Sequence, residues 1–355
     1  MSNLTNDTSF GEASDVREQR PTVVVSALTC HRSETLERLL QEFQRMELPL
    51  QFRTVLLIVD NDKDGSAQEL VASYQEKIDN LRYVIEPRPG IPVARNRALD
   101  EAVAMDGSAL CFIDDDEYPD EKWLIRLVDH WQKTGASLVG GPVNVAPADA
   151  SYGPVQKLIN RSLAARQFRK NRAAAEWPEH GRRPTIVTNN WLCDLDWARQ
   201  SGVRFDESLL VTGGSDTDFY RKTLQMGGES SWCSEAVVYE IMGPGRLTLK
   251  YQFWRGASQS ITHFHFKHQT MTPKLAFMTT LGAVLRFILG GLLMVFPVLG
   301  VASLVMATRA MGWAVGRLQA MFGLRSKLYE NATESKSESV EHTTDPQNAG
   351  SRNAA

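Results

Sequence analysis

The sequence predicts an α/β protein with a doubly wound, mostly parallel sheet, followed by a C-terminal apolar helical segment that associates with a membrane. Three observations support this prediction. Short apolar, β-branched runs alternate with segments of helical period over the first 145 residues. Acidic and amide residues follow the second and the fourth of these runs directly. Much later, residues 287–307 form an uncharged run that is long enough to cross a bilayer.

The predicted strands and helices alternate in order along the chain. The strands are TVVVSAL (22–28), RTVLLIVD (53–60), LRYVIEP (81–87), SALCFIDDD (108–116) and ASLVGGPVNV (136–145). The helices are SETLERLLQEFQRM (33–46), SAQELVASYQEKI (66–78), IPVARNRALDEAVA (91–104) and EKWLIRLVDHWQK (121–133). In the first helix Ser33 is a candidate N-cap, and Leu36, Leu39, Leu40 and Phe43 form an apolar stripe. This βαβα order predicts parallel strands with helices on both faces.

Composition and missing motifs exclude several classes of protein. The formal net charge of −3 gives no electrostatic reason to expect a nucleic-acid partner. The four cysteines form no C-x-x-C pair, which argues against a zinc site or a disulfide framework and favours a reducing, cytoplasmic compartment. No G-x-G-x-x-G follows the first strand and no P-loop motif is present, so the sequence does not predict a dinucleotide-binding or P-loop fold.

The two ends and the apolar run suggest a division of the chain. We expect a disordered leader over residues 1–20, a catalytic domain over 21–260, a membrane-associated helical segment over 261–323 and a disordered tail over 324–355. Between residues 275 and 308 the only ionisable residue is Arg286, and basic residues flank the run on both sides. This pattern suits a hairpin or an interfacial helix pair on the cytoplasmic face of the cell membrane better than a single crossing, and spanning or lying in the membrane both stay open. The alternative is a buried helix of a soluble protein.

Acidic residues stand at the carboxyl ends of two predicted strands, where doubly wound sheets bind ligands. Asp60, Asn61 and Asp62 begin a segment, VDNDKDGSAQEL, that resembles the start of a calcium loop. An EF-hand loop needs a bidentate Glu at position 12 and follows a helix, but here position 12 is Val71 and a strand precedes the segment. The calcium interpretation is therefore weak, and residues 63–66 are expected to form a turn into the next helix.

The second acidic run, CFIDDDEYPD, favours a metal–diphosphate site. Consecutive carboxylates repel one another, and a divalent cation relieves this repulsion. Mg²⁺ or Mn²⁺ is bound by one or two carboxylates together with phosphate oxygens and water. The alternative for Asp114, Asp115 and Asp116 is a charged, exposed loop.

Two later segments are candidates for the reaction itself. In LVTGGSDTDFYRK, Asp216 is either a general base, which needs an ionised carboxylate beside an acceptor hydroxyl, or an acid favoured by the helix dipole. In TNNWLCDLDW, the amides of Asn189 and Asn190 and the ring of Trp191 either bind a saccharide or belong to the core.

With these motifs in this order, residues 21–260 resemble the family 2 glycosyltransferases of the GT-A fold, and most of all the subgroup with the succinoglycan-biosynthesis glucosyltransferases. VSALTCHR resembles the first strand and the turn after it, and LLIVDNDKDGS resembles the V-V-D-D-G-S motif of the family. EPRPGIPVARNRAL, LCFIDDDEYP and TGGSDTDFYRK resemble, in turn, the family's Arg-containing segment, its D-x-D motif and its E-D motif. Ser215 stands where the family has Glu, and Asn61 where it often has Asp.

The resemblance implies a role for each matched position. Thr29 and Arg32 would line the nucleotide pocket, one of Asp60, Asn61 and Asp62 would read the base, and Arg95 would lie near the diphosphate. Asp114 and Asp115 would contact ribose and metal, Asp116 would be the principal metal ligand, and Asp216 would be the catalytic base. Arg246 and Arg255 are further candidates for diphosphate contacts, or else part of a basic interfacial surface.

The expected activity is therefore an inverting, metal-dependent sugar transfer that uses Mg²⁺ or Mn²⁺. The donor would be a nucleotide sugar, with UDP-sugars first, and the acceptor a saccharide or lipid-linked saccharide in polysaccharide synthesis. Two alternatives are a polyprenyl-phosphate sugar transferase, whose ionised acceptor needs less of a base, and a non-catalytic membrane-anchored binding module.

Overall fold

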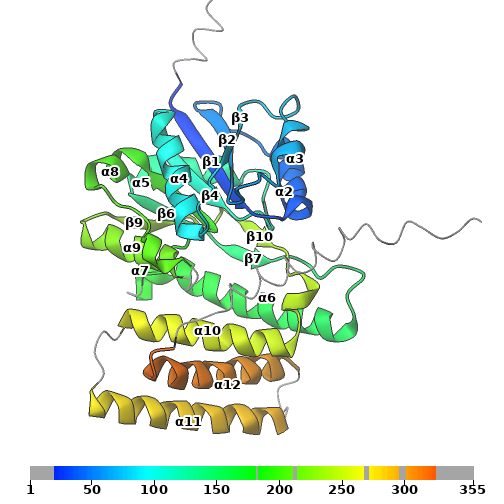
Figure 1. Cartoon of the computed structure of the whole chain (residues 1–355), viewed down its shortest axis with the longest axis vertical. Helices are drawn as coiled ribbons and strands as arrows, with labels where there is room; N and C mark the ends of the chain where they lie inside the picture. The colour runs from blue at the N-terminus through cyan, green and yellow to red at the C-terminus, as the bar shows by residue number, and fades with distance from the viewer. Residues whose placement is uncertain (1–19, 181–182, 211–213, 268–271, 296–300, 325–355) are drawn as a thin grey trace, which may run out of the picture. The chain divides into compact units, whose positions relative to one another are not determined.

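The structure is a computed structural model that describes residues 20–180, 183–210, 214–267, 272–295 and 301–324 (Figure 1). The predicted leader, and the tail beyond residue 324, fall outside these ranges. The chain divides into two compact units: unit 1 holds the described residues up to Gly243, and unit 2 those from Pro244 on. The domain boundary predicted at residue 260 lies inside helix α10, Leu249–Lys267.

Unit 1 is built around a seven-stranded sheet of order β3-β2-β1-β4-β8-β6-β9. The strands are β1 (Thr22–Thr29), β2 (Arg53–Asp60), β3 (Leu81–Ile85), β4 (Gly107–Ile113), β6 (Leu138–Gly140), β8 (Asn190–Asp194) and β9 (Ser230–Trp232). A small second sheet has the order β5-β10-β7, from β5 (Glu117–Pro119), β10 (Val238–Glu240) and β7 (Val143–Val145). The prediction of a doubly wound, mostly parallel sheet is confirmed, since β1, β2, β3 and β4 pair in parallel.

Helices cover both faces of the large sheet, as the alternating pattern requires. They are α2 (Ser33–Arg45), α3 (Gln68–Ala72), α4 (Ile91–Ala104), α5 (Trp123–Thr134), α6 (Pro154–Ala175), α7 (Trp177–His180), α8 (Leu195–Ser201) and α9 (Ser215–Gln225), with a 3₁₀ turn at Glu207–Leu209. Val23 and Val25 of β1 pack in one core with the apolar stripes of α2 and α5, whereas Val24 packs in the other with α4 and α8. Successive side chains of a strand point to opposite faces, so one buried strand supplies both cores.

Two local predictions differ from the structure. The second helix was expected over residues 66–78, but α3 ends at Ala72 and turns follow to residue 80. Ser73 donates to the Leu70 carbonyl, a local bond of the kind that competes with helix continuation. The strand expected over 136–145 is two strands, β6 and β7, in different sheets. Gly141 and Pro142 separate them, and glycine and proline weaken a strand interior.

Unit 2 consists of a 3₁₀ turn, Pro244–Arg246, and three helices: α10, α11 (Pro273–Val295) and α12 (Val301–Met321). α12 lies between α10 and α11 (Figure 1). The apolar run at 287–307 is thus divided between two helices that pack side by side rather than forming one continuous helix. The residues between them, 296–300, lie outside the described chain.

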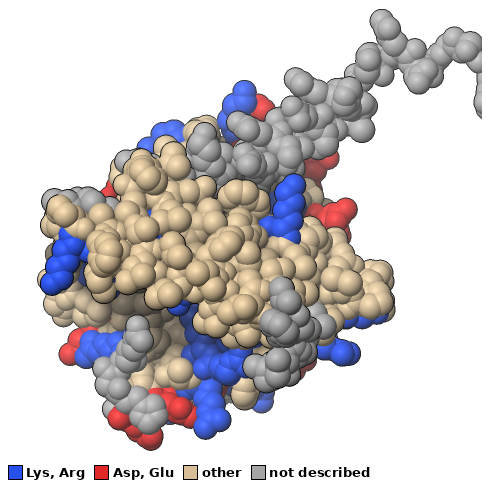
Figure 2. All heavy atoms as spheres, turned by 90° about the horizontal axis from the view of Figure 1, so that it is seen from below, with Lys and Arg blue, Asp and Glu red and all other residues tan. Residues whose placement is uncertain are grey.

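Within the described residues, one helix is long and apolar enough to cross a membrane, Pro273–Met294 of α11. Only 11 % of this stretch is buried. Its exposed apolar side chains are Phe277, Met278, Leu281, Val284, Leu285, Phe287, Ile288, Leu289, Leu292 and Met294. Figure 2 looks onto this side of unit 2, where uncharged side chains form a broad band with Lys and Arg at its margins.

Small residues let α10 and α12 approach closely. A Cβ added at Gly316 would lie closer to the Ala257 carbonyl oxygen than van der Waals contact allows. A Cβ added at Gly312 would lie equally close to the Phe253 carbonyl oxygen. Close contact at small residues is how helices associate where lipid removes the hydrophobic driving force.

We therefore expect Gly316→Ala to destabilise unit 2 by about 1–3 kcal/mol, the usual cost of overpacking. Gly282→Ala in α11 is the matched control, because a Cβ there meets nothing within 4 Å. It should stabilise the helix by roughly 1 kcal/mol through helix propensity. Thermal unfolding of the two full-length variants in detergent tests this, and equal midpoints would contradict the close packing.

Candidate functional site

The carboxyl ends of β1, β2 and β4 meet at one edge of the large sheet. Thr29, the last residue of β1, pairs in register with Asp60, the last residue of β2. The turn after β4 carries Asp114, Asp115 and Asp116. The sheet thus brings together the acidic residues that the sequence predicted for the nucleotide and the metal.

Arg32 and Thr29 hold the second acidic run. The Arg32 guanidinium donates to Asp115 Oδ1 at 2.5 Å and to Asp116 Oδ2 at 2.6 Å. The Thr29 hydroxyl donates to Asp115 Oδ2 at 3.1 Å. Both carboxylates are nearly buried, with 2 % and 9 % of their side chains exposed, whereas Arg32 is about one third exposed at 32 %. The turn after β1 therefore places a cation beside two nearly buried carboxyl groups in the turn after β4.

Burial dominates the electrostatics of this turn. It raises the pKa of Asp115 to about 7, against the opposing effect of Arg32, and the neighbouring Asp116 and Asp114 carboxylates raise it further. Burial also raises the pKa of Glu117 well above its usual value. Glu117 accepts from the Asp114 backbone N–H at 3.0 Å and from Asn189 Nδ2 at 3.1 Å. Perturbed carboxylates of this kind mark candidate functional sites.

The segment that opens with Asp60 has two different tasks. Asp60 is fully buried and accepts from the Ala67 N–H and the Tyr83 hydroxyl, both at 2.8 Å. Its other oxygen, Oδ1, has no hydrogen-bond partner among the described residues. Asp62 accepts from the backbone N–H groups of Asp64 and Ser66. Residues 62–66 thus form a turn whose backbone N–H groups donate to the Asp62 carboxylate, while Asp60 keeps one buried oxygen without a hydrogen-bond partner among the described residues.

Asn61 ties the loop after β3 to the site. Its Nδ2 donates to the carbonyls of Glu86 and Arg88, at 3.0 and 2.7 Å, and its Oδ1 accepts from the Gly90 N–H at 2.9 Å. With these three hydrogen bonds the Asn61 amide positions the start of α4. Both of its Nδ2 hydrogens are used, so it has little capacity left to hydrogen-bond a nucleotide base. Of the three candidates to read the base, the contacts leave Asp60 as the one with an unused acceptor.

Arg95 and Asp216 lie on helices α4 and α9, which pack on the face of the large sheet opposite to α2. Arg95, on α4, donates to Ser215 Oγ at 2.9 Å, and its guanidinium lies 5.6 Å from the centre of the Phe205 ring. Gly214, with φ of 92°, precedes α9 in the left-handed region that favours glycine. Asp216 is partly exposed in the first turn of α9 and accepts from the Thr217 N–H at 2.7 Å. Ser215, which replaces the family's Glu, thus contacts Arg95 and orients the start of α9.

The structure places two of the three predicted saccharide contacts in the core. Trp191 is 2 % exposed and stacks on Phe112 at 5.7 Å between ring centres. Asn190 is also 2 % exposed and fully hydrogen bonded. Asn189 is different, because its Oδ1 is buried without a hydrogen-bond partner among the described residues. Arg246, in the 3₁₀ turn Pro244–Arg246, and Arg255, on α10, belong to unit 2.

Asn190 joins three parts of unit 1. Its Oδ1 accepts from Trp123 Nε1 at 2.9 Å, and its Nδ2 donates to the carbonyls of Pro142 and Ala236, at 3.0 and 2.7 Å. We expect Asn190→Ala to lower the stability of unit 1 by roughly 3 kcal/mol or more, because an indole N–H and two carbonyls lose their partners in the core. Thermal unfolding followed by tryptophan fluorescence measures this. Asn189→Ala, which loses one bond, should cost clearly less, and an equal loss would contradict the assignment.

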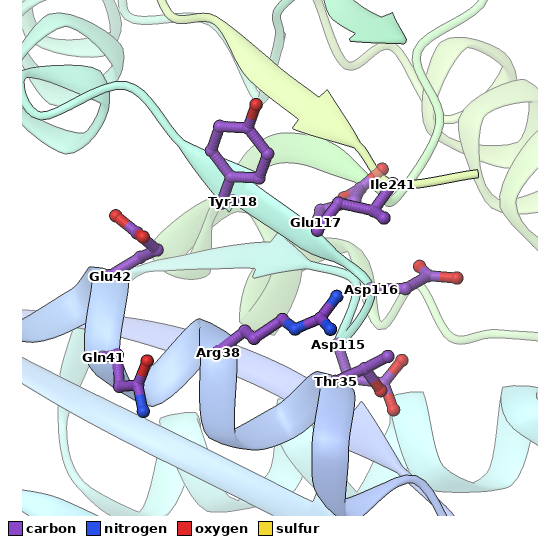
Figure 3. A pocket seen from close by; sticks show the side chains of 9 residues that line it. All are labelled: Thr35, Arg38, Gln41, Glu42, Asp115, Asp116, Glu117, Tyr118 and Ile241. Atoms are coloured by element: carbon purple, nitrogen blue, oxygen red, sulfur yellow. The ribbon is translucent and has the colours of Figure 1, made fainter. Parts of the chain in front are cut away.

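A pocket of about 170 Å³ lies beside Asp115 and Asp116. Figure 3 shows its lining: Thr35, Arg38, Gln41 and Glu42 from α2, Asp115, Asp116, Glu117 and Tyr118 from the turn and strand after β4, and Ile241. Arg38 reaches from α2 toward the turn that carries the carboxylates (Figure 3). Sequence reasoning missed Arg38 and Tyr118. Tyr118 follows the acidic run directly and could have been found there, whereas Arg38 sits on the polar side of a helix and gave no signal.

The comparisons with known proteins agree with this geometry. The family model of Glycosyl transferase family 2 matches residues 22–187. The chain is 33% identical over 234 residues to the Succinoglycan biosynthesis protein ExoM of Rhizobium meliloti (strain 1021), and covers 71% of that protein and 66% of itself. It is also 30% identical over 124 residues to Glycosyltransferase AglE of Haloferax volcanii. This alignment covers 35% of the present chain and 40% of AglE.

Among solved structures, S. aureus TarS 1–349 in complex with UDP-GlcNAc is similar at a TM-score of 0.49 and 13% identity, covering 85% of this chain and 92% of that chain. TarS 1–349 in another crystal structure gives a TM-score of 0.48 at 14% identity, with the same coverage. The relation to ExoM and the match of the family model do not depend on these likenesses. The expected GT-A fold is confirmed by the family and by the doubly wound sheet, and the chain belongs to Glycosyl transferase family 2.

Proposed function

We propose that unit 1 transfers a sugar, with inversion, from a nucleotide-diphosphate donor to a hydroxyl group of an acceptor. The observation that carries the proposal is a set of hydrogen bonds in which Arg32 donates to Asp115 and Asp116 and Thr29 donates to Asp115. It gathers charged and polar groups at the carboxyl end of the sheet, where α/β proteins bind ligands. Family membership supports glycosyl transfer as the reaction.

The residues of the acidic turn fit a divalent metal. Carboxylate oxygens are the donors that Mg²⁺ and Mn²⁺ prefer, and Asp116 and Asp114 would hold the ion. Among the described residues no group of three or more His, Cys, Asp or Glu could hold a metal. Asp114 and Asp116 would leave the other ligand positions to water and a diphosphate. When bound, the ion supplies positive charge beside the leaving diphosphate.

The chain's own groups would bind and orient the donor. The free Oδ1 of Asp60 offers an acceptor for an N–H of the base, and an N–H beside a carbonyl, as in uracil, fits one carboxylate oxygen. Uracil, thymine and guanine all present such an N–H, and among them we place UDP-sugars first as donors. Arg32 and Thr29 would line the nucleotide pocket, and Arg95 would lie near the diphosphate. Asp115 and Asp114 would contact ribose and metal.

Asp216 would be the catalytic base. A base must reach the acceptor hydroxyl, and Asp216 is a partly exposed carboxylate in the first turn of α9. The Asp216 carboxylate takes the hydroxyl proton as the acceptor oxygen attacks the anomeric carbon from the face opposite the diphosphate. A direct displacement of this kind inverts the configuration.

The acceptor is proposed to be a saccharide or lipid-linked saccharide in polysaccharide synthesis. The name of the relative ExoM supports polysaccharide synthesis, and the apolar α11 supports a membrane-bound acceptor. We assign catalysis to residues 21–260 and membrane association to 261–323, at the cytoplasmic face of the cell membrane.

A donor screen tests the proposal. Full-length protein is incubated with UDP-, GDP- and dTDP-sugars, with Mn²⁺ or Mg²⁺ and with chelator, and nucleotide release is measured. We expect metal-dependent release from one donor class, UDP-sugars first. Absence of release from every donor, with acceptor lipids from a polysaccharide-producing cell present, would refute sugar transfer.

A further inference from the structure

The helices of unit 2 place two arginines around one tryptophan. The guanidinium carbons of Arg286, on α11, and Arg317, on α12, lie 4.0 and 4.2 Å from the centre of the Trp313 ring. The two carbons are therefore no further apart than the sum of these distances. Arg317 also lies 5.2 Å from the ring centre of Phe264, on α10. All three helices thus contribute to one cluster, which we call the Arg286–Arg317 cluster.

Residues 244–324, which hold the described part of unit 2, offer these arginines no counter-charge. Residues 244–324 contain no Asp or Glu, while they contain Arg246, Lys250, Arg255, Lys267, Lys274, Arg286, Arg309 and Arg317. Arg317 is only 7 % exposed, and its Nε has no hydrogen-bond partner among the described residues. Neither Arg317 nor Arg286 forms an ion pair within the described part of the chain. In the cluster the buried Arg317 guanidinium contacts the rings of Trp313 and Phe264, and the Arg286 guanidinium contacts the Trp313 ring as well.

Aromatic contacts alone do not offset the cost of burying the Arg317 charge. A buried charge is costly unless it is paired, and a cation–π contact returns only part of that cost. Like charges this close also repel each other. An anion that accepts hydrogen bonds from both guanidinium groups would offset both penalties. Arg286 is exposed, so an anion can approach from its side.

We propose that the Arg286–Arg317 cluster binds the phosphate group of a membrane lipid. The planar guanidinium donates two parallel hydrogen bonds to phosphate, which makes arginine the preferred residue for this group. Arg286 stands among the exposed apolar side chains of α11, so a phosphate that reaches it would carry acyl or prenyl chains along that helix. This binding site is independent of the sugar-transfer reaction proposed for unit 1.

Lipid binding by full-length protein in a non-ionic detergent tests the proposal by native mass spectrometry. The probe is dioleoyl phosphatidic acid, a phosphate monoester with two acyl chains, and dioleoyl phosphatidylcholine is the lipid without net charge. We expect phosphatidic acid to bind in preference to phosphatidylcholine. Arg286→Gln and Arg317→Gln should each weaken its binding about ten-fold, since each removes a charge-assisted contact.

Arg309→Gln is the matched control. Arg309 lies on α12 as well, but its guanidinium donates to Gln252 Oε1 at 2.5 Å and to Gln259 Oε1 at 2.7 Å. Its loss removes the same charge from the same helix and should change binding less than two-fold. Arg286→Gln changes an exposed side chain and should fold, so the test does not depend on the buried Arg317.

Three outcomes would overturn the proposal. Unchanged phosphatidic acid binding in both cluster variants would show that neither guanidinium binds the headgroup. An equal loss in Arg309→Gln would show a general charge effect. If glycerol 3-phosphate, which carries the same phosphate without acyl chains, competes as strongly as phosphatidic acid, the cluster binds free phosphate and not a lipid.

Discussion

Replacement of Asp216 with Asn should lower kcat for sugar transfer by about 10²–10⁴-fold, the usual contribution of a positioned general base. Asn keeps the size of the side chain and the acceptor for the Thr217 N–H, so the start of α9 should be retained. What it loses is the capacity to take a proton from the acceptor hydroxyl. Steady-state kinetics with the donor found in the screen measure the loss, and the KM for the donor should change little.

Asp218→Asn provides the control on the same helix. Asp218 is 4 % exposed and pairs with Arg221 at 3.0 Å and with Lys222 at 2.8 Å. Its replacement should lower the thermal midpoint and leave kcat per folded molecule near normal. If Asp216→Asn turns over at a near-normal rate, Asp216 is not the base. An acceptor that is already ionised, such as a polyprenyl phosphate, would then be favoured.

Sequence patterns were sufficient to predict the parallel part of the sheet and the edge of the sheet at which the acidic residues lie. Strands β1, β2 and β4 are buried on both faces, so their apolar runs are easy to recognise, and parallel pairing follows from the helices between them. Since parallel strands end at one edge, Thr29, Asp60 and Asp115 were expected together. Strand β8 was not found, because its antiparallel insertion between β4 and β6 depends on contacts far apart in the chain.

Side-chain roles were harder to predict than positions. Asn61 and Asn190 have the same chemistry as ligand-binding amides, yet each makes three bonds to protein groups. Whether an amide has an unused donor or acceptor depends on backbone groups that only the folded chain brings near. The same holds for Arg32, whose two carboxylate partners lie more than eighty residues away.

The Arg286–Arg317 cluster gave a partial sequence signal. Arg286 was conspicuous as the single ionisable residue of residues 275–308. Its ring partner, Trp313, is on the next helix, and the run between them was expected to be a hairpin or an interfacial helix pair rather than a single crossing. The hairpin-like packing of α11 and α12 is what brings the two residues together.

Replacement of Asp116 with Asn should abolish the metal-dependent part of donor turnover, a loss of roughly 10²–10³-fold. Several kcal/mol of charge stabilisation is the usual contribution of a catalytic metal, and each 1.4 kcal/mol is ten-fold in rate. Asn is isosteric and Arg32 keeps its 2.5 Å contact with Asp115, so unit 1 should still fold. Kinetics with and without Mn²⁺ measure the loss.

Thermal unfolding separates a binding defect from a folding defect in this variant. A ligand at a hundred times its Kd stabilises the folded state by about 2.7 kcal/mol, so Mn²⁺ with UDP should raise the wild-type midpoint clearly. Asp116→Asn should lose this rise and keep the midpoint of the ligand-free protein. Asp64→Asn removes an acid that is 78 % exposed in the turn after β2, and should keep both the rise and the rate. If Asp116→Asn keeps the Mn²⁺-dependent rise, the metal is held elsewhere; if Asp64→Asn loses it, the segment after β2 binds the ion.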